Sequence, residues 1–209
     1  DSGRWSLDAE FARDTALLES ERDLLQSART RGGLGLIPSR LAGTGAIWLH
    51  RTPQDEVRRR IELIHRPYHS ALKAALEQAR EAFGIAVLLD CHSMPPRSAK
   101  DAGAAPLVFG DRHGTSAARE LVDAATGAAR RFGYATACNT PYAGGYVTSH
   151  HGRPAEDIHA IQLEIDRSLY LASDLRAPGA RFDAVAELIA AITEALAARA
   201  APPEAIAAE

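Results

Sequence analysis

A five-residue apolar run that leads directly into polar residues is the strongest constraint on the fold of this chain. Ile85 to Leu89 are all aliphatic, they follow Gly84, and the polar segment Asp90 to Ser93 (Asp-Cys-His-Ser) comes next. An uninterrupted apolar run of this length suits a strand that is covered on both faces, which is typical of the central strands of an α/β sheet. In such sheets, functional side chains gather beyond the carboxyl ends of the strands. The run therefore predicts a buried strand with candidate functional residues at its end.

The periodicity of the other segments supports the same fold class. Strands that alternate with helices, with no interdomain linker, predict one α/β domain over residues 1–209 with a mixed, mostly parallel sheet. The helices are expected at Leu7–Ala28, Val57–Leu76 (with a kink at Pro67), Ser116–Phe132 and Val185–Leu196, and the further strands at Tyr134–Cys138 and Ala160–Ile165.

Composition excludes several classes of protein. The 209 residues include 24 Lys and Arg against 27 Asp and Glu, a net charge of -3, so the chain lacks the basic excess of a duplex-binding protein. Two cysteines are too few for a disulfide framework or a four-cysteine zinc site. The apolar runs are too short to cross a bilayer, and no signal-like segment is present. We therefore expect a cytoplasmic protein with no nucleic-acid or membrane partner.

His92 is the first candidate for chemistry. A neutral imidazole is a good zinc ligand, and Asp90, two residues earlier, could accept the second ring N–H and fix the tautomer. The alternative is a hydrogen-bonded histidine that closes a strand end. Cys91 is a competing nucleophile, but neighbours in a strand point to opposite faces, so a Cys91–His92 pair is not expected. Cys91 is interpreted as a small buried hydrophobe.

Glu164 is the second candidate. It shares one face of its predicted strand with Gln162, while the opposite face is entirely aliphatic. A carboxylate on a buried strand is costly unless it is paired or functional. It could act as a general base that activates a metal-bound water. The alternative is an acid on a solvent-facing edge strand, paired with Arg167.

A glycine-rich loop, Ala143–Tyr146, forms the third candidate region. It leads to His150 and Arg153. Glycine allows the backbone to approach a ligand closely, and arginine can hold a carboxylate through two parallel hydrogen bonds. The alternative is an ordinary surface loop. His65 and His69 are four residues apart, but no glutamate follows His65 as the helical metalloprotease pattern requires, and His69 is interpreted as a packed or capping residue.

Five segments resemble, in the same order, the N-formylglutamate amidohydrolase family. The combination is specific, whereas any one segment alone would be weak, and the resemblance runs from about Gly32 to the last predicted helix. The segments are Gly33–Pro38 (GLGLIP), Arg66–His69 (RPYH), Gly84–Pro95 (GIAVLLDCHSMP), Asn139–Gly145 (NTPYAGG) and Gln162–Tyr170 (QLEIDRSLY).

The resemblance implies a three-layer α/β/α fold, like that of zinc carboxypeptidases and phosphorylase/hydrolase-like proteins. It also implies a zinc-dependent hydrolase that cleaves N-formyl-L-glutamate to formate and glutamate in histidine degradation. By this resemblance His92 falls on a zinc-ligand position and Glu164 on the position of the catalytic general acid/base. The positions expected around the substrate are Asn139, Tyr142, His150 and Arg153.

The sequence departs from the family at its start. Family members carry an N-terminal Ser-Pro-His-Ser-Gly motif that supplies, with a nearby acid, the other zinc ligands, and this motif is absent here. A catalytic zinc takes three protein ligands plus water, so His92 alone cannot hold one. We therefore expect further ligands upstream of Asp1 and a domain without its N-terminal strand segment. Two alternatives stay open: a zinc hydrolase of another N-acyl amino acid or peptide, and a metal-free binding protein for acidic amino-acid ligands derived from the enzyme.

Overall fold

The structure, a computed structural model, describes residues 40–41, 45–46, 48, 52–98 and 104–201. The chain divides into two compact units, Asp1–Ser70 and Ala71–Glu209. The helix expected at Leu7–Ala28 lies outside the described residues. The expectation of a single domain stays a prediction.

The first unit contains a helix that is interrupted where a kink was predicted. Pro67 has no N–H to donate to the carbonyl of Leu63, and just before it the Arg66 N–H donates to the carbonyl of Ile61, five residues back. The result is a wider, π-helical turn instead of a sharp bend. The elements are β1 (Arg40–Leu41), antiparallel to β2 (Gly45–Ala46), then α3 (Gln54–Arg60), the π-helical turn η1 (Ile61–His65) and the start of α4 (Arg66–Phe83).

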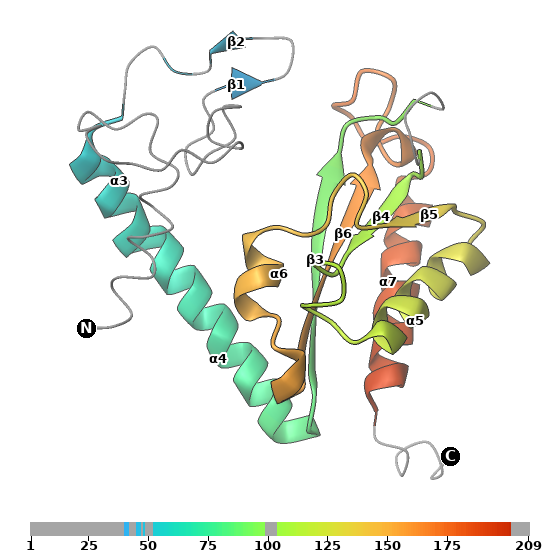
Figure 1. Cartoon of the computed structure of the whole chain (residues 1–209). Coiled ribbons are helices and arrows are strands. Elements are labelled where there is room, and N and C mark those ends of the chain that lie inside the picture. The colour runs from blue at the N-terminus through green and yellow to red at the C-terminus, as the bar shows by residue number, and fades with distance from the viewer. Residues whose placement is uncertain (1–39, 42–44, 47, 49–51, 99–103, 202–209) are drawn as a thin grey trace. The chain divides into compact units, whose positions relative to one another are not determined.

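The second unit is built on a four-stranded mixed sheet with the order β3-β6-β4-β5 (Figure 1). Two of the three strand pairs, β3–β6 and β4–β5, are parallel, and β4–β6 is antiparallel. The predicted mixed, mostly parallel α/β sheet is therefore confirmed. The strands are β3 (Ala86–Met94), β4 (Leu107–Gly110), β5 (Thr136–Cys138) and β6 (Ile158–Asp166).

Among the described strands, β6 and not β3 has the buried position. All nine residues of β6 are buried, whereas β3 lies at one end of the sheet, with Cys91, His92 and Ser93 exposed. Among the described strands, the prediction of a central strand at Ile85 to Leu89 is wrong. The interpretation of Cys91 as buried is also wrong. An apolar run indicates that both faces of the strand are covered by other side chains. It does not indicate whether both edges of the strand pair with other strands, because those strands come from distant segments of the chain. His92 and its neighbours also lie within β3 and not beyond its end.

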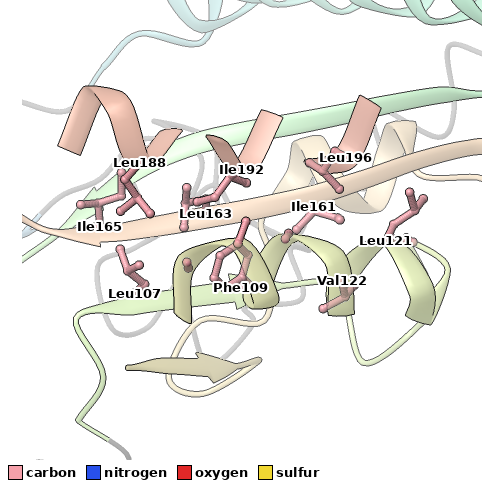
Figure 2. Close-up of a cluster of buried hydrophobic side chains, with 14 of the residues drawn as sticks. Leu107, Phe109, Leu121, Val122, Ile161, Leu163, Ile165, Leu188, Ile192 and Leu196 are labelled. Carbon is pink, nitrogen blue, oxygen red and sulfur yellow. The ribbon is translucent and has the colours of Figure 1, made fainter. Parts of the chain in front are cut away.

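The main core lies on one face of the sheet. Alternation along β6 directs Ile161, Leu163 and Ile165 to this face, where they pack against α5 (Arg119–Arg131) and α7 (Phe182–Ala200) (Figure 2). Each fully buried aliphatic side chain contributes about 1.5–3 kcal/mol. This packing fixes which way β6 faces, and therefore where its polar residues point.

The opposite face of the sheet carries the polar residues of β6 and is partly covered by two helices. The short helix α6 (Tyr146–His151) packs on β6, and Leu76 of α4 forms a small buried cluster with Ala86 and Ile158. Two 3-10 turns, η2 (Pro154–Glu156) and η3 (Arg167–Leu169), flank β6. None of the helices in the described ranges is long and apolar enough to cross a membrane.

Candidate active site

Strands β3 and β6 place His92 and Glu164 opposite each other. The parallel register pairs His92 with Glu164 and Asp90 with Gln162. Because residues two apart in a strand share a face, all four side chains project from the same face of the sheet. His92 Nδ1 lies 3.9 Å from Glu164 Oε1, and His92 Nε2 lies 3.0 Å from Asp90 Oδ2. Strand pairing thus brings together the two strongest candidates from the sequence.

Glu164 is a buried carboxylate that a neighbouring amide holds. The residue is 7% exposed, and Gln162 Nε2 donates a hydrogen bond to its Oε1 at 2.8 Å. Burial raises the pKa of Glu164; His92 and the hydrogen bond from Gln162 oppose this rise, and Asp90 adds to it. The alternative of a solvent-facing acid on an edge strand is wrong, since β6 lies inside the sheet. A buried carboxylate with a raised pKa suits proton transfer.

Asp90 Oδ2 is a buried oxygen without a hydrogen-bond donor among the described residues. Its 3.0 Å contact with His92 Nε2 is not aligned as a hydrogen bond, so the tautomer-fixing bond predicted from the sequence is not formed. An unsatisfied carboxylate oxygen beside an imidazole favours a cation. However, the described part of the chain contains no group of three or more His, Cys, Asp or Glu side chains that could hold a metal ion. The described residues therefore do not form a complete zinc centre.

The loop Thr140–Gly145 crosses β4 on this same face of the sheet. Gly110, which pairs with Gln162, lies beneath the loop, and a Cβ on it would lie 2.6 Å from the carbonyl carbon of Ala143. The Arg112 N–H donates to the Ala143 carbonyl at 2.7 Å and fixes the crossing. Only glycine leaves room here, because the atoms in the way belong to the backbone.

The far end of the loop is tied to the buried carboxylate through Gln162. The Gly145 N–H donates to Gln162 Oε1 at 2.7 Å, and Gln162 Nε2 donates to Glu164. Tyr142, expected near the substrate, lies in this loop and is 36% exposed. No role for Gln162 was predicted from the sequence. The available signal was a second polar residue on one face of an otherwise apolar strand.

Asn139 directly follows β5 and stabilises a turn. Its Oδ1 accepts hydrogen bonds from the backbone N–H groups of Asp111 and His113, at 3.1 and 3.3 Å, and its Nδ2 donates to Asp111 Oδ1 at 2.6 Å. Its backbone has a positive φ of 60°, which asparagine tolerates better than most residues. Both ends of the amide are thus engaged within the fold, and contact of Asn139 with a substrate stays a prediction.

Arg153 lies far from Glu164. It pairs with Ile158 at the start of β6, and at about 3.3 Å per residue the strand separates Ile158 from Glu164 by about 20 Å. Its Nε donates to Glu156 Oε2 at 2.9 Å, and its Nη2 lies 3.8 Å from Glu77 Oε1. The structure therefore does not bring Arg153 together with the buried carboxylate.

The adjacent histidines of α6 have different environments. His150 is exposed and stacks on Tyr146, with ring centroids 5.0 Å apart, and the Tyr146 hydroxyl lies 3.4 Å from His150 Nδ1. His151 is 1% exposed. Burial, together with the charges of His150 and Arg153, lowers its pKa to about 4. His150 is thus accessible to a ligand, whereas His151 is a neutral part of the fold.

Comparison with known sequences identifies relatives over most of the chain. Residues 6–171 match the N-formylglutamate amidohydrolase family. The N-formylglutamate deformylase of Pseudomonas putida is 34% identical over 179 residues, which cover 82% of this chain and 66% of the relative. The enzyme of the same name from Pseudomonas aeruginosa is 30% identical over 147 residues, which cover 68% of this chain and 54% of the relative. The chain thus spans about two thirds of the first relative and about half of the second.

Two solved structures are similar to the structure of this chain, and one of them carries the name of the family that the sequence matches. The N-formylglutamate amidohydrolase of Ralstonia eutropha JMP134 superimposes with a TM-score of 0.74 and 36% identity, over 90% of this chain and 69% of that chain. A gene product of Agrobacterium tumefaciens, 16% identical with a TM-score of 0.57 over 78% of this chain and 61% of that chain, shares the fold alone. The α/β fold expected from the sequence is confirmed. The chain belongs to the N-formylglutamate amidohydrolase family.

Proposed function

We propose that this protein is an amide hydrolase that cleaves N-formyl-L-glutamate to formate and glutamate. The observation that carries the proposal is the environment of Glu164, a buried carboxylate with a raised pKa that lies opposite His92. The relatives named N-formylglutamate deformylase support the choice of substrate.

In the proposed reaction Glu164 acts first as a general base and then as a general acid. It takes a proton from a water molecule while the water oxygen bonds to the formyl carbon. The carbon–nitrogen bond then breaks, and the departing glutamate nitrogen receives that proton from Glu164. A raised pKa suits both halves of this exchange, since the same group must accept the proton and release it within one turnover.

Two groups remain proposed substrate contacts on this face of the sheet. They are Tyr142, on the loop that crosses β4, and His150, the exposed histidine of α6. The proposal does not depend on Asn139 or Arg153, because the first is bonded within a turn and the second is paired with a nearby glutamate.

Zinc dependence is part of the proposal. His92 would be one ligand, and the other ligands would have to come from outside the described residues. The buried, unsatisfied Asp90 Oδ2 beside His92 supports a cation at this position. The family resemblance further supports a place for the reaction in histidine degradation, and a cytoplasmic location is part of the proposal.

Substitution of Glu164 by Gln tests the central role. Glu164→Gln keeps the shape of the side chain but cannot take up the proton, so kcat for N-formyl-L-glutamate should fall by about 10²–10⁴-fold. The matched control is Glu187→Gln, on an exposed position of α7, which should keep wild-type turnover. Undiminished turnover of Glu164→Gln would refute the assignment.

A substrate panel separates the proposed reaction from the alternatives. We expect the highest kcat/KM for N-formyl-L-glutamate among formyl, acetyl and succinyl amino acids. Preference for another acyl group would identify a hydrolase of a different N-acyl amino acid. Binding of N-formyl-L-glutamate without release of formate would instead identify a binding protein.

A further inference from the structure

Gln162 is a buried side chain that connects the loop over β4 with Glu164. It is 5% exposed, and both ends of its amide are bonded. Its Oε1 accepts a hydrogen bond from the Gly145 N–H at 2.7 Å, and its Nε2 donates to Glu164 Oε1 at 2.8 Å. One side chain thus links a backbone group of the loop to the carboxylate that we propose as the general base.

These two bonds fix the orientation of the amide. A backbone N–H can only donate, so the amide oxygen must face Gly145, and the NH2 group must then face Glu164. An NH2 group can also only donate, so Glu164 Oε1 must act as an acceptor. Within the described ranges no side chain or backbone group forms a hydrogen bond with the other oxygen, Oε2. The two carboxylate oxygens of Glu164 therefore have different roles.

We propose that Gln162 is a positioning residue for the hydrolysis. It keeps Oε1 of Glu164 as an acceptor, so that Oε2 is the oxygen that takes the proton from water. It also couples the position of this carboxylate to the path of the Thr140–Gly145 loop. This inference rests on the proposed function, in which Glu164 is the general base.

The length of the Gln162 side chain matters for this role. A Cβ on Gly145 would lie 3.2 Å from Gln162 Oε1, so the loop already lies close to the amide. An asparagine is shorter by one methylene group, about 1.5 Å, and would lengthen contacts of 2.7 and 2.8 Å beyond the range of a hydrogen bond. The same chemical group one bond shorter could therefore not hold both partners.

Two substitutions separate the two bonds. Gln162→Met removes both, and Gln162→Glu keeps an acceptor for the Gly145 N–H but replaces the NH2 donor to Glu164 with a second buried carboxyl group, which repels Glu164 or shares a proton with it. Because displacement of a catalytic group by about 1 Å costs about 10²-fold in rate, we expect kcat to fall by about 10–100-fold in both variants. KM for N-formyl-L-glutamate should rise in Gln162→Met, where the loop is released, and stay near wild type in Gln162→Glu.

Ser116→Ala is the matched control for loss of a buried hydrogen bond. The Ser116 hydroxyl donates to the carbonyl of Ala160 at 2.8 Å, and Ala160 lies in β6, the strand that also carries Gln162. Ser116 does not contact Glu164. This variant should lower Tm but keep the wild-type kcat. A fall of kcat in both Ser116→Ala and Gln162→Met, in proportion to the fall of Tm, would show that Gln162 is merely structural and would overturn the proposal.

Hydrogen exchange at the Gly145 amide gives a readout that does not depend on activity. Exchange should be at least about 10-fold faster in Gln162→Met than in the wild type, and close to wild type in Gln162→Glu. Unchanged exchange in Gln162→Met would refute the coupling to the loop. Wild-type kcat in Gln162→Met, when Glu164→Gln has lost activity, would refute positioning but leave the proposed function intact. Full activity of Glu164→Gln would refute the proposed function itself.

Discussion

Gly110→Ala tests whether the path of the loop over β4 determines the geometry of the site. A Cβ at residue 110 would lie 2.6 Å from both the carbonyl carbon of Ala143 and the nitrogen of Gly144, and 3.0 Å from the Ala143 oxygen. All three atoms belong to the backbone, so no side chain can rotate away. The loop itself must move.

The structure gives the size of this movement. Ordinary van der Waals contact begins near 3.4 Å, so the loop must rise by about 0.8 Å. Such overpacking costs about 1–3 kcal/mol of stability. The movement also stretches two hydrogen bonds of 2.7 Å, from the Arg112 N–H to Ala143 and from the Gly145 N–H to Gln162. Because Gln162 holds Glu164, we expect turnover to fall by up to about 10²-fold.

Urea unfolding and steady-state kinetics with N-formyl-L-glutamate measure both effects. The matched control is Gly127→Ala in α5, where a Cβ would meet only Arg131 Nη1 at an ordinary 3.7 Å. Alanine favours a helix interior, so this control should gain up to about 1 kcal/mol and keep its turnover. If Gly110→Ala unfolds with the wild-type free energy and turns over at the wild-type rate, the close crossing of loop and strand is refuted.

Two further predictions concern histidines. Because the pKa of His151 is lowered to about 4 from 6.5, the unfolded chain binds a proton between these values that the folded chain does not. The contribution of His151 to the free energy of unfolding should be complete above pH 6.5 and fall by at most about 3 kcal/mol as the pH drops to 4. Urea unfolding at pH 7.5 and 4.5 should therefore show a smaller difference in the free energy of unfolding for His151→Asn than for the wild type. An equal difference in the two proteins would contradict this prediction. Metal analysis of the full-length protein should find one zinc ion per chain and less in His92→Ala, whereas unchanged zinc in that variant would exclude His92 as a ligand.

The sequence by itself determined the faces of β6 and most of the larger elements, whereas the short strand β4 and the short helix α6 were not predicted. Alternation in β6 is a local property of an extended chain, and it put Gln162 and Glu164 on one face before any partner was known. The same holds for the amphipathic helices, and for the polar residues that follow the apolar run at Ile85 to Leu89. His92 and Glu164 were therefore recognisable as candidates one at a time.

Only the tertiary structure decided which of these residues meet. Strand order and register depend on pairing between distant segments, which no local pattern encodes. That pairing sets His92 opposite Glu164 and makes β6 the buried strand. It also places Arg153 beside Ile158, which lies about 20 Å from Glu164 along β6. The role of Gln162 has the same origin, because its amide gains a function only when the loop crosses Gly110 and brings the Gly145 N–H to it.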